Sequence, residues 1–274
     1  MKVAVLGSTG MLGSMVARYF DSRSEYEAFL SYRDVNLSFG KNRFYFDALD
    51  SRSLASFPEV DYVINCIGCV KQHDHGVRTY MKVNAQFPHF LAATCERLGS
   101  KLIHITTDCV FSGKRGSYHE LDEPDCTDSY GISKELGEPR NCMVLRTSII
   151  GPEIRSHYSL LDWARSNRNK KVQGYLNHHW NGITSLEYAK VCDKIIKNDW
   201  WAPSLRHVFG QTLSKAAMLH EFNKVYDLGL KIEPYEHPEP VDRTLSTVYS
   251  MNERLEIPSF SAMMSDLLLF EEES

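Results

Sequence analysis

The 274-residue sequence lacks any run of 18 or more apolar residues, and it therefore predicts no transmembrane helix. It also lacks a basic excess, because 31 Lys and Arg stand against 35 Asp and Glu, giving a net charge of -4 and a pI near 6.3. This balance argues against a broad nucleic-acid-binding surface. No internal repeat and no low-complexity linker is present. With 43% hydrophobic and 24% charged residues, the composition is that of a soluble globular protein.

Signs of export are also missing. The opening MKVAVLGSTG reaches glycine after five apolar-biased residues, which is too short for a signal-peptide core. The seven cysteines are scattered and odd in number, so we expect free thiols in a reducing cytoplasm. Cys66 and Cys69 have metal-ligand spacing, but no second Cys or His pair completes a zinc site, and we expect no metal.

A glycine-rich turn follows the first predicted strand. KVAVLG runs into Gly7, Gly10 and Gly13, and a helical pattern with Leu12 and Phe20 comes next. Strand, glycine turn and helix in this order are typical of a dinucleotide site. Gly7 permits the tight turn, Gly10 lets the backbone approach a pyrophosphate, and Gly13 lets helix and strand pack closely.

The end of the second predicted strand, Tyr26–Tyr32, bears on which cofactor is used. An acidic residue there suits a ribose 2′-hydroxyl, whereas an arginine suits a 2′-phosphate. The sequence has Arg33 followed by Asp34. We therefore expect NADPH as the cofactor, with NADH still possible.

Strand-like and helical stretches alternate along the rest of the chain. This alternation predicts an α/β fold, a Rossmann-type doubly wound parallel sheet with helices on both faces. We expect an NAD(P)-binding domain over residues 1–151. Residues 152–274 should form a smaller C-terminal substrate-binding lobe, with some segments returning to the first domain. The predicted strands are 44–46, 62–66, 102–106 and 143–146; the predicted helices are 77–97 (kinked or split at Pro88), 130–137, 159–166, 184–197, 214–226 and 260–270.

Two motifs suggest chemistry at the carboxyl end of the sheet. The buried strand in LIHITTDCVF ends in hydroxyl groups, including Thr107, which cost free energy to bury unless they bind something. Further on, Tyr130 and Lys134 stand four residues apart and therefore share one helical face. A nearby ammonium should lower the pKa of the phenol, making Tyr130 a usable proton donor.

With GSTGMLG, NCIG, TTDCVFSG, SYGISKELGE and LRTSIIGP, the sequence resembles the extended short-chain dehydrogenases/reductases. Within them it most resembles the dTDP-4-dehydrorhamnose reductase family of sugar-nucleotide reductases. The resemblance implies that Tyr130 protonates the substrate oxygen, Lys134 binds the nicotinamide ribose, and Thr107 bonds the substrate carbonyl. The residue patterns and the resemblance together give these expected cofactor contacts: Gly7, Thr9, Gly10, Met11, Leu12, Gly13, Arg33, Asp47, Ala48, Cys66, Ile67, Gly68, Asn84, Tyr130 and Lys134.

The C-terminal lobe should supply the sugar-nucleotide pocket. Asn177 and Trp180 lie in a polar and aromatic segment, where Trp180 either stacks on the ligand or belongs to the core. A diphosphate needs a cation, for which Arg155 and Arg243 are the candidates.

The resemblance implies NADPH-dependent reduction of a nucleotide-linked 4-keto-6-deoxy sugar, for deoxysugar and polysaccharide biosynthesis. One alternative is a bifunctional 3,5-epimerase/4-reductase, in which Cys109 and His157 would move protons next to the ketone. Another is a non-catalytic regulatory subunit that keeps the fold. The expected partner is a nucleotide sugar, with no nucleic acid and no membrane, and a homodimer is possible.

Overall fold

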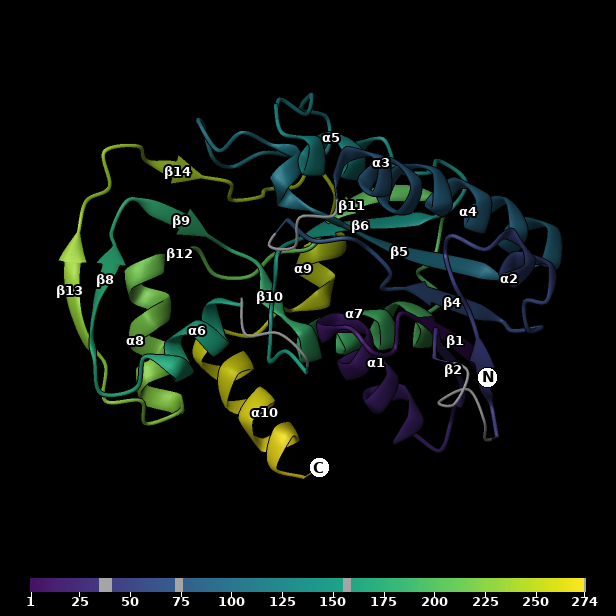
Figure 1. The fold of residues 1–274 in the computed structure, drawn as a ribbon, viewed down its shortest axis with the longest axis horizontal. Coiled ribbons are helices and arrows are strands. Elements are labelled where there is room, and N and C mark those ends of the chain that lie inside the picture. The colour runs from purple at the N-terminus through teal and green to yellow at the C-terminus, as the bar shows by residue number, and fades with distance from the viewer. Residues whose placement is uncertain (35–40, 72–75, 155–158, 274) are drawn as a thin grey trace.

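Seven parallel strands form the central sheet of the structure, a computed structural model that describes residues 1–34, 41–71, 76–154 and 159–273 (Figure 1). Their order is β11-β6-β5-β4-β1-β2-β3, and every neighbouring pair is parallel. The predicted α/β class with a Rossmann-type parallel sheet is confirmed. The strands are β1 (Lys2–Leu6), β2 (Glu27–Tyr32), β3 (Arg43–Tyr45), β4 (Tyr62–Asn65), β5 (Lys101–Thr107), β6 (Met143–Thr147) and β11 (Ser204–His207).

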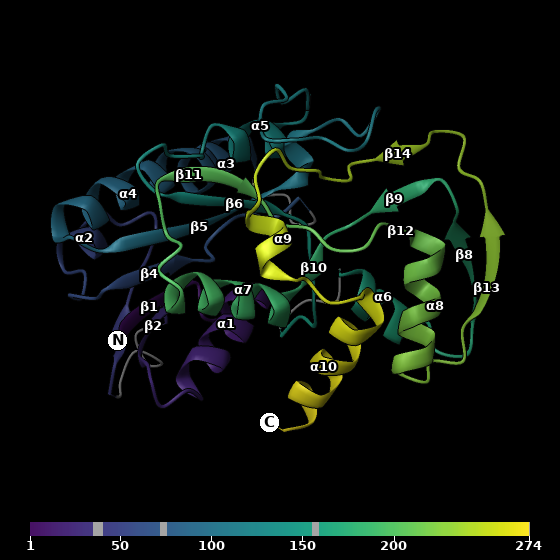
Figure 2. The same ribbon diagram turned by 180° about the vertical axis from the view of Figure 1, so that it is seen from behind.

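Helices cover both faces of this sheet, as the front and back views show (Figures 1 and 2). On one face, α1 (Met11–Asp21) packs against α7 (Ser185–Lys197). The other face carries α2 (Ser51–Ala55), α3 (Gly76–Tyr80), α4 (Phe87–Leu98) and α5 (Ser129–Glu135). Residues 3–6 of β1 are fully buried, as expected of a parallel strand with both faces covered.

The second half of the chain builds a smaller lobe beside the sheet (Figure 1). It contains the parallel pair β8 (Lys171–Tyr175) and β13 (Lys231–Tyr235) and the three-stranded sheet β12-β9-β14. The strands of that small sheet are β12 (Leu213–Ser214), β9 (His178–Trp180) and β14 (Val241–Asp242). Its helices are α6 (Leu160–Ser166), α8 (Lys215–Val225), α9 (Met251–Leu255) and α10 (Phe260–Glu272), and β7 (Ile149–Ile150) pairs with β10 (Ile183–Thr184). Two elements from this half, β11 and α7, return to complete the first domain.

Pro88 changes the helix that precedes it. Between α3 and α4, residues Met81–Gln86 form a π-helix, and Pro88 stands in the first turn of α4. In a regular α-helix the proline ring would clash with the carbonyl of the residue four positions earlier, which is Asn84. The wider π-turn relieves that clash, and π-turns inside helices are frequent at functional sites.

No helix in the described ranges is both long enough and apolar enough to cross a membrane. All seven cysteines are free thiols.

Candidate active site

The glycine turn lies at the carboxyl end of β1, in the middle of the sheet. Gly7 has a φ of +82°, which favours glycine. A Cβ on Gly13 would overlap the carbonyl oxygen of Gly7, so glycine is required for the helix to pack on the turn. On Gly10 a Cβ would come no nearer than 3.6 Å to Gly7 O, so the protein alone leaves room there. Gly10 is also the N-cap of α1 and supplies no side-chain cap. The first N–H groups of α1 are therefore left for a ligand, as a pyrophosphate site requires.

The other predicted contacts of this turn divide into two kinds. Thr9 and Met11 are half-buried at its surface, whereas Leu12 belongs to the hydrophobic core beneath. The turn is tied to β2, because the Gly7 N–H donates to Ser31 Oγ at 2.9 Å. Arg33 follows β2, is exposed, and lies close enough to Cys69 to lower the pKa of that thiol, although burial raises it more. Arg33 therefore reaches the same edge of the sheet as the end of β4.

Past β3, Asp47 and Ala48 begin a turn in which Asp47 Oδ1 accepts the Leu49 N–H at 2.9 Å. Ala48 and Leu49 line one side of an open hollow of ≈590 Å³. Lys82 and Phe90 line it from the π-helix and α4.

Asn84 joins the end of β4 to α5. Its Oδ1 accepts the Cys69 N–H at 2.8 Å, and its Nδ2 donates to Cys69 O at 3.0 Å and to Ser133 Oγ at 3.1 Å. A Cβ on Gly68 would lie 3.5 Å from Asn84 Oδ1 and 3.6 Å from Lys134 Nζ. The predicted cofactor residues Cys66, Ile67, Gly68 and Asn84 thus come together with Lys134.

Thr107 ends β5 and caps the short 3₁₀-helix 108–110. Its hydroxyl donates to Asp108 Oδ1 at 3.0 Å and accepts the Cys109 N–H at 3.1 Å. All three residues face the amino-terminal end of α5. The helix can approach this segment closely because Gly131 has no side chain. A Cβ at that position would overlap the carbonyl oxygen of Cys109.

Tyr130 stands in the first turn of α5, which begins where Asp128 Oδ1 accepts the Gly131 N–H at 3.0 Å. Burial, and next the neighbouring Cys109, raise the pKa of the Tyr130 phenol, whereas a hydrogen bond with Thr107 lowers it. Thr107 and Tyr130 are therefore side by side. Such an arrangement can hold and protonate a carbonyl oxygen placed between them.

Lys134 is 6% exposed and lies on the same helix. Its Nζ donates to Ile105 O at 3.1 Å, and burial lowers its pKa to about 8. The sequence analysis expected this ammonium to lower the pKa of the Tyr130 phenol. In the structure that pKa lies above its ordinary value, because burial desolvates the phenol and the neighbouring Cys109 adds to the effect. The ammonium instead donates to the backbone of β5.

Cys109 touches the same site but is poorly suited to act as a base. Burial and the adjacent Asp108 raise the pKa of its thiol to about 12. The thiol is therefore protonated near neutral pH. Its predicted partner His157 and the predicted diphosphate ligand Arg155 lie outside the described residues.

The predicted substrate residues differ in their surroundings. Trp180 is 6% exposed and packs edge-on against Phe260 at 5.5 Å, so the core alternative fits it better than ligand stacking. Asn177 uses its amide to join two loops, donating to His237 O at 2.7 Å and accepting the His237 N–H at 3.0 Å. Arg243, by contrast, reaches the site, where its Nε donates to Phe111 O at 2.9 Å.

Two charged groups at this site were not predicted as site residues. Asp108 follows Thr107 directly, and Lys215 opens α8 in the second lobe. The position of Asp108 beside the TT pair was a usable signal. Nothing in the sequence around Lys215 indicated the site, because β12 and α8 are brought there by tertiary folding.

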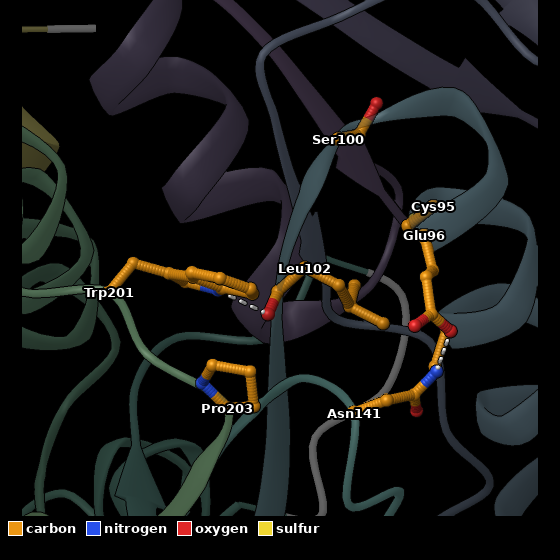
Figure 3. Close-up of a pocket in the computed structure, with 8 residues that line it drawn as sticks. Cys95, Glu96, Ser100, Leu102, Asn141, Trp201 and Pro203 are labelled. Carbon is orange, nitrogen blue, oxygen red and sulfur yellow. Dashed lines mark hydrogen bonds between the residues drawn. The ribbon is translucent and has the colours of Figure 1, made fainter.

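A small cavity of ≈160 Å³ lies at the amino-terminal ends of the strands, near the starts of β5, β6 and β11. Figure 3 shows the residues that line it. Its walls include Leu102, near the start of β5, whose carbonyl accepts a hydrogen bond from Trp201 Nε1 at 2.9 Å. Since ligands of parallel sheets bind beyond the carboxyl ends of the strands, this cavity is not the candidate site. Among the residues that are described, no group of three or more His, Cys, Asp or Glu is placed to hold a metal ion.

The comparisons with known proteins agree on one family. The model of the RmlD substrate binding domain matches residues 1–172. A probable low-salt glycan biosynthesis reductase of Haloferax volcanii is 32% identical over 167 residues, 55% of this chain and 54% of that protein. The chain thus spans about half the length of that relative. A dTDP-4-dehydrorhamnose reductase of Aggregatibacter actinomycetemcomitans is 25% identical over 226 residues, 77% of this chain and 74% of that protein.

Solved structures show the same fold. A dTDP-4-dehydrorhamnose reductase of Clostridium acetobutylicum has a TM-score of 0.78 at 19% identity, covering 99% of this chain and 100% of its own. The Bacillus anthracis enzyme in complex with NADP has a TM-score of 0.79 at 17% identity, covering 98% and 99%.

Proposed function

The chain belongs to the RmlD substrate binding domain family, and on that premise we propose that it uses NADPH to reduce the 4-keto group of a nucleotide-linked 4-keto-6-deoxy sugar. The family is one of sugar-nucleotide reductases. The observation that carries the proposal is the contact between Tyr130 and Thr107 at the carboxyl end of β5. Lys134 lies one helical turn further, beside Gly68.

The residues present fit a dinucleotide cofactor. Gly10 leaves room for a pyrophosphate and the uncapped α1 offers N–H groups to it. Lys134 would bind the nicotinamide ribose from beside Gly68, and Ala48 would flank the adenine. When bound, the nicotinamide supplies the hydride.

Tyr130, Thr107 and Lys134 would then divide the remaining work. The Thr107 hydroxyl positions the substrate carbonyl, and the Tyr130 phenol gives its proton to the carbonyl oxygen. The raised pKa of Tyr130 keeps the phenol protonated before the reaction. Lys134, with a pKa near 8, is mostly charged at pH 7 and stabilises the phenolate as it forms.

The preference for NADPH rests on Arg33. Its guanidinium follows β2 and can pair bidentately with a 2′-phosphate. The relative from Bacillus anthracis was solved in complex with NADP.

The experiment measures the oxidation of NADPH by the purified protein with dTDP-, UDP- and GDP-linked 4-keto-6-deoxy sugars. We expect turnover with at least one of them, and a strongly reduced rate in the Tyr130→Phe variant. If none is reduced while NADPH still binds, the proposed function is wrong.

A further inference from the structure

His104 is a fully buried histidine beside the site, and the proposed mechanism does not use it. It lies in β5, and its partner in the register with β4 is Asn65, which is also fully buried. Asn65 Nδ2 lies 3.0 Å from His104 Nδ1, and Asn65 Oδ1 accepts the Ile67 N–H at 3.1 Å. The two side chains therefore link β5 to the turn that follows β4.

These hydrogen bonds fix the orientation of both side chains. A backbone N–H can only donate, so the atom of the Asn65 amide that faces Ile67 is the oxygen. The amide nitrogen then faces His104, and because it too can only donate, His104 Nδ1 is the acceptor. The hydrogen of the neutral imidazole is consequently on Nε2, since the bond made by one ring nitrogen decides the state of the other.

The surroundings keep the His104 imidazole neutral. Burial, and next the Lys134 ammonium, lower its pKa well below the ordinary value. His89 has a smaller effect in the same direction, whereas the backbone of Gly137, at the end of α5, favours the charged form. A hydrogen on Nδ1 would also point at the Asn65 amide donor and break that bond. His104 therefore acts as a fixed acceptor toward β4.

The turn held in this way, Cys66–Gly68, is expected to lie against the nicotinamide end of the cofactor. A Cβ on Gly68 would lie 3.6 Å from Lys134 Nζ, so the turn and the ammonium are neighbours. Lys134 Nζ donates to the carbonyl of Ile105, the residue after His104. One short segment of β5 thus contacts both groups that are expected to meet the nicotinamide ribose.

We propose that His104 is a positioning residue for the cofactor, which acts through Asn65 to hold the turn Cys66–Gly68 in its binding conformation. The inference rests on the proposed function in taking NADPH as the ligand of this site. Without the Nδ1 acceptor, the Asn65 amide has a buried donor left unpaired, which costs free energy and favours rotation away from Ile67. The cofactor must then order the turn as it binds, and its affinity falls.

The test uses three variants that each keep a different part of the imidazole. His104→Asn places an oxygen where Nδ1 stood, His104→Gln reaches the place of Nε2, and His104→Phe keeps a ring without either nitrogen. NADPH binding is measured by fluorescence titration without a sugar nucleotide. We expect the Kd to rise about tenfold in the Phe and Gln variants and to stay within about twofold of the wild type in His104→Asn. An unchanged Kd in His104→Phe, or an equal rise in His104→Asn, overturns the proposal.

His207 provides the matched control for lost stability. It is also a buried histidine in the large sheet, but it lies on the edge strand β11. His207→Phe should lower the melting temperature, as His104→Phe should, and leave the Kd for NADPH unchanged. An equal rise of the Kd in His207→Phe would mean that destabilisation alone weakens binding, which overturns the role of His104.

A measurement on the wild-type protein does not depend on any variant folding. Nitrogen NMR of the histidine rings should show His104 with its hydrogen on Nε2 and a bare Nδ1 throughout about pH 5–8. A hydrogen on Nδ1 in this range would contradict the bond to Asn65 and overturn the proposal. The titrations need no turnover, so NADPH binding that depends on His104, without reduction of any 4-keto sugar, would contradict the proposed function while supporting this role.

Discussion

The ion pair between Glu138 and Arg146 can test how burial determines the contribution of an ion pair to the free energy of unfolding. Arg146 lies on β6, and Glu138 follows α5, which carries Tyr130 and Lys134. The pair is bidentate: Arg146 Nε donates to Glu138 Oε1 at 2.8 Å, and Arg146 Nη2 donates to Glu138 Oε2 at 2.6 Å. The two side chains are only 4% and 11% exposed. It fastens the end of α5 to β6 of the sheet.

Glu138→Gln keeps the shape but removes the carboxylate, which leaves the Arg146 guanidinium buried and without a counterion. Breaking a buried pair in this way costs about 3–5 kcal/mol. Glu233 provides the matched control, since it pairs with Lys171 at 2.9 Å. The side chain of Lys171 is 71% exposed and that of Glu233 is 60% exposed. Glu233→Gln should cost less than about 1 kcal/mol, because exposed pairs contribute little.

Equilibrium unfolding in urea, followed by circular dichroism, measures both variants against the wild type. We expect the midpoint of Glu138→Gln to fall clearly at an unchanged slope, and that of Glu233→Gln to stay near the wild-type value. Equal losses in the two variants, within about 1 kcal/mol, would refute the reasoning from burial.

Three further outcomes are expected. Tyr130→Phe should keep cofactor affinity but lower kcat by roughly 10²–10⁴-fold, the usual contribution of a positioned general acid; near-normal turnover would remove Tyr130 from the mechanism. Lys134→Met should weaken both NADPH binding and rate. In addition, since burial lowers the pKa of Lys134 from 10.5 to about 8, the unfolded chain holds that proton at higher pH than the folded one. The free energy of unfolding of the wild type relative to Lys134→Met should therefore rise between about pH 8 and 10.5 in pH-dependent melting, and a flat difference would contradict this assignment. Arg33→Ala should weaken NADPH more than NADH in fluorescence titrations, whereas equal affinities unchanged by the substitution would count against a role in 2′-phosphate binding.

Local sequence patterns predicted most of the first domain. The strands came from buried apolar runs such as 102–106, which the structure extends by one residue at each end, to Lys101–Thr107. Pro88 was expected to kink or split the helix over 77–97, and the structure shows a π-helix just before it. The predicted helix over 184–197 also fits, because α7 begins at Ser185 and the hydroxyl of Thr184 caps it by accepting the Glu187 N–H at 3.1 Å. These features depend on neighbours in the chain, which a sequence displays directly.

The second lobe could not be read in the same way. Its small sheet pairs Ser214 with His179 and Asp242 with His179, contacts between segments more than 30 residues apart. Lys215 reaches the site only through that pairing. The pKa of Tyr130 was predicted in the wrong direction for a related reason. Helical spacing put a cation one turn away, but burial, which depends on the whole fold, raises the pKa, and the Lys134 ammonium bonds the Ile105 carbonyl instead.

The position of β11 has a consequence for how the chain folds during synthesis. Its residues, Ser204–His207, form the edge of the large sheet beside β6, and α7 covers α1 from the same late part of the chain. When only the first 151 residues have left the ribosome, β6 therefore has an open hydrogen-bonding edge, and the apolar face of α1 is uncovered. Such edges and faces promote association between chains. The nucleotide-binding half thus depends on later residues to become a finished unit, and a fragment cut after residue 151 should aggregate rather than fold as a separate domain.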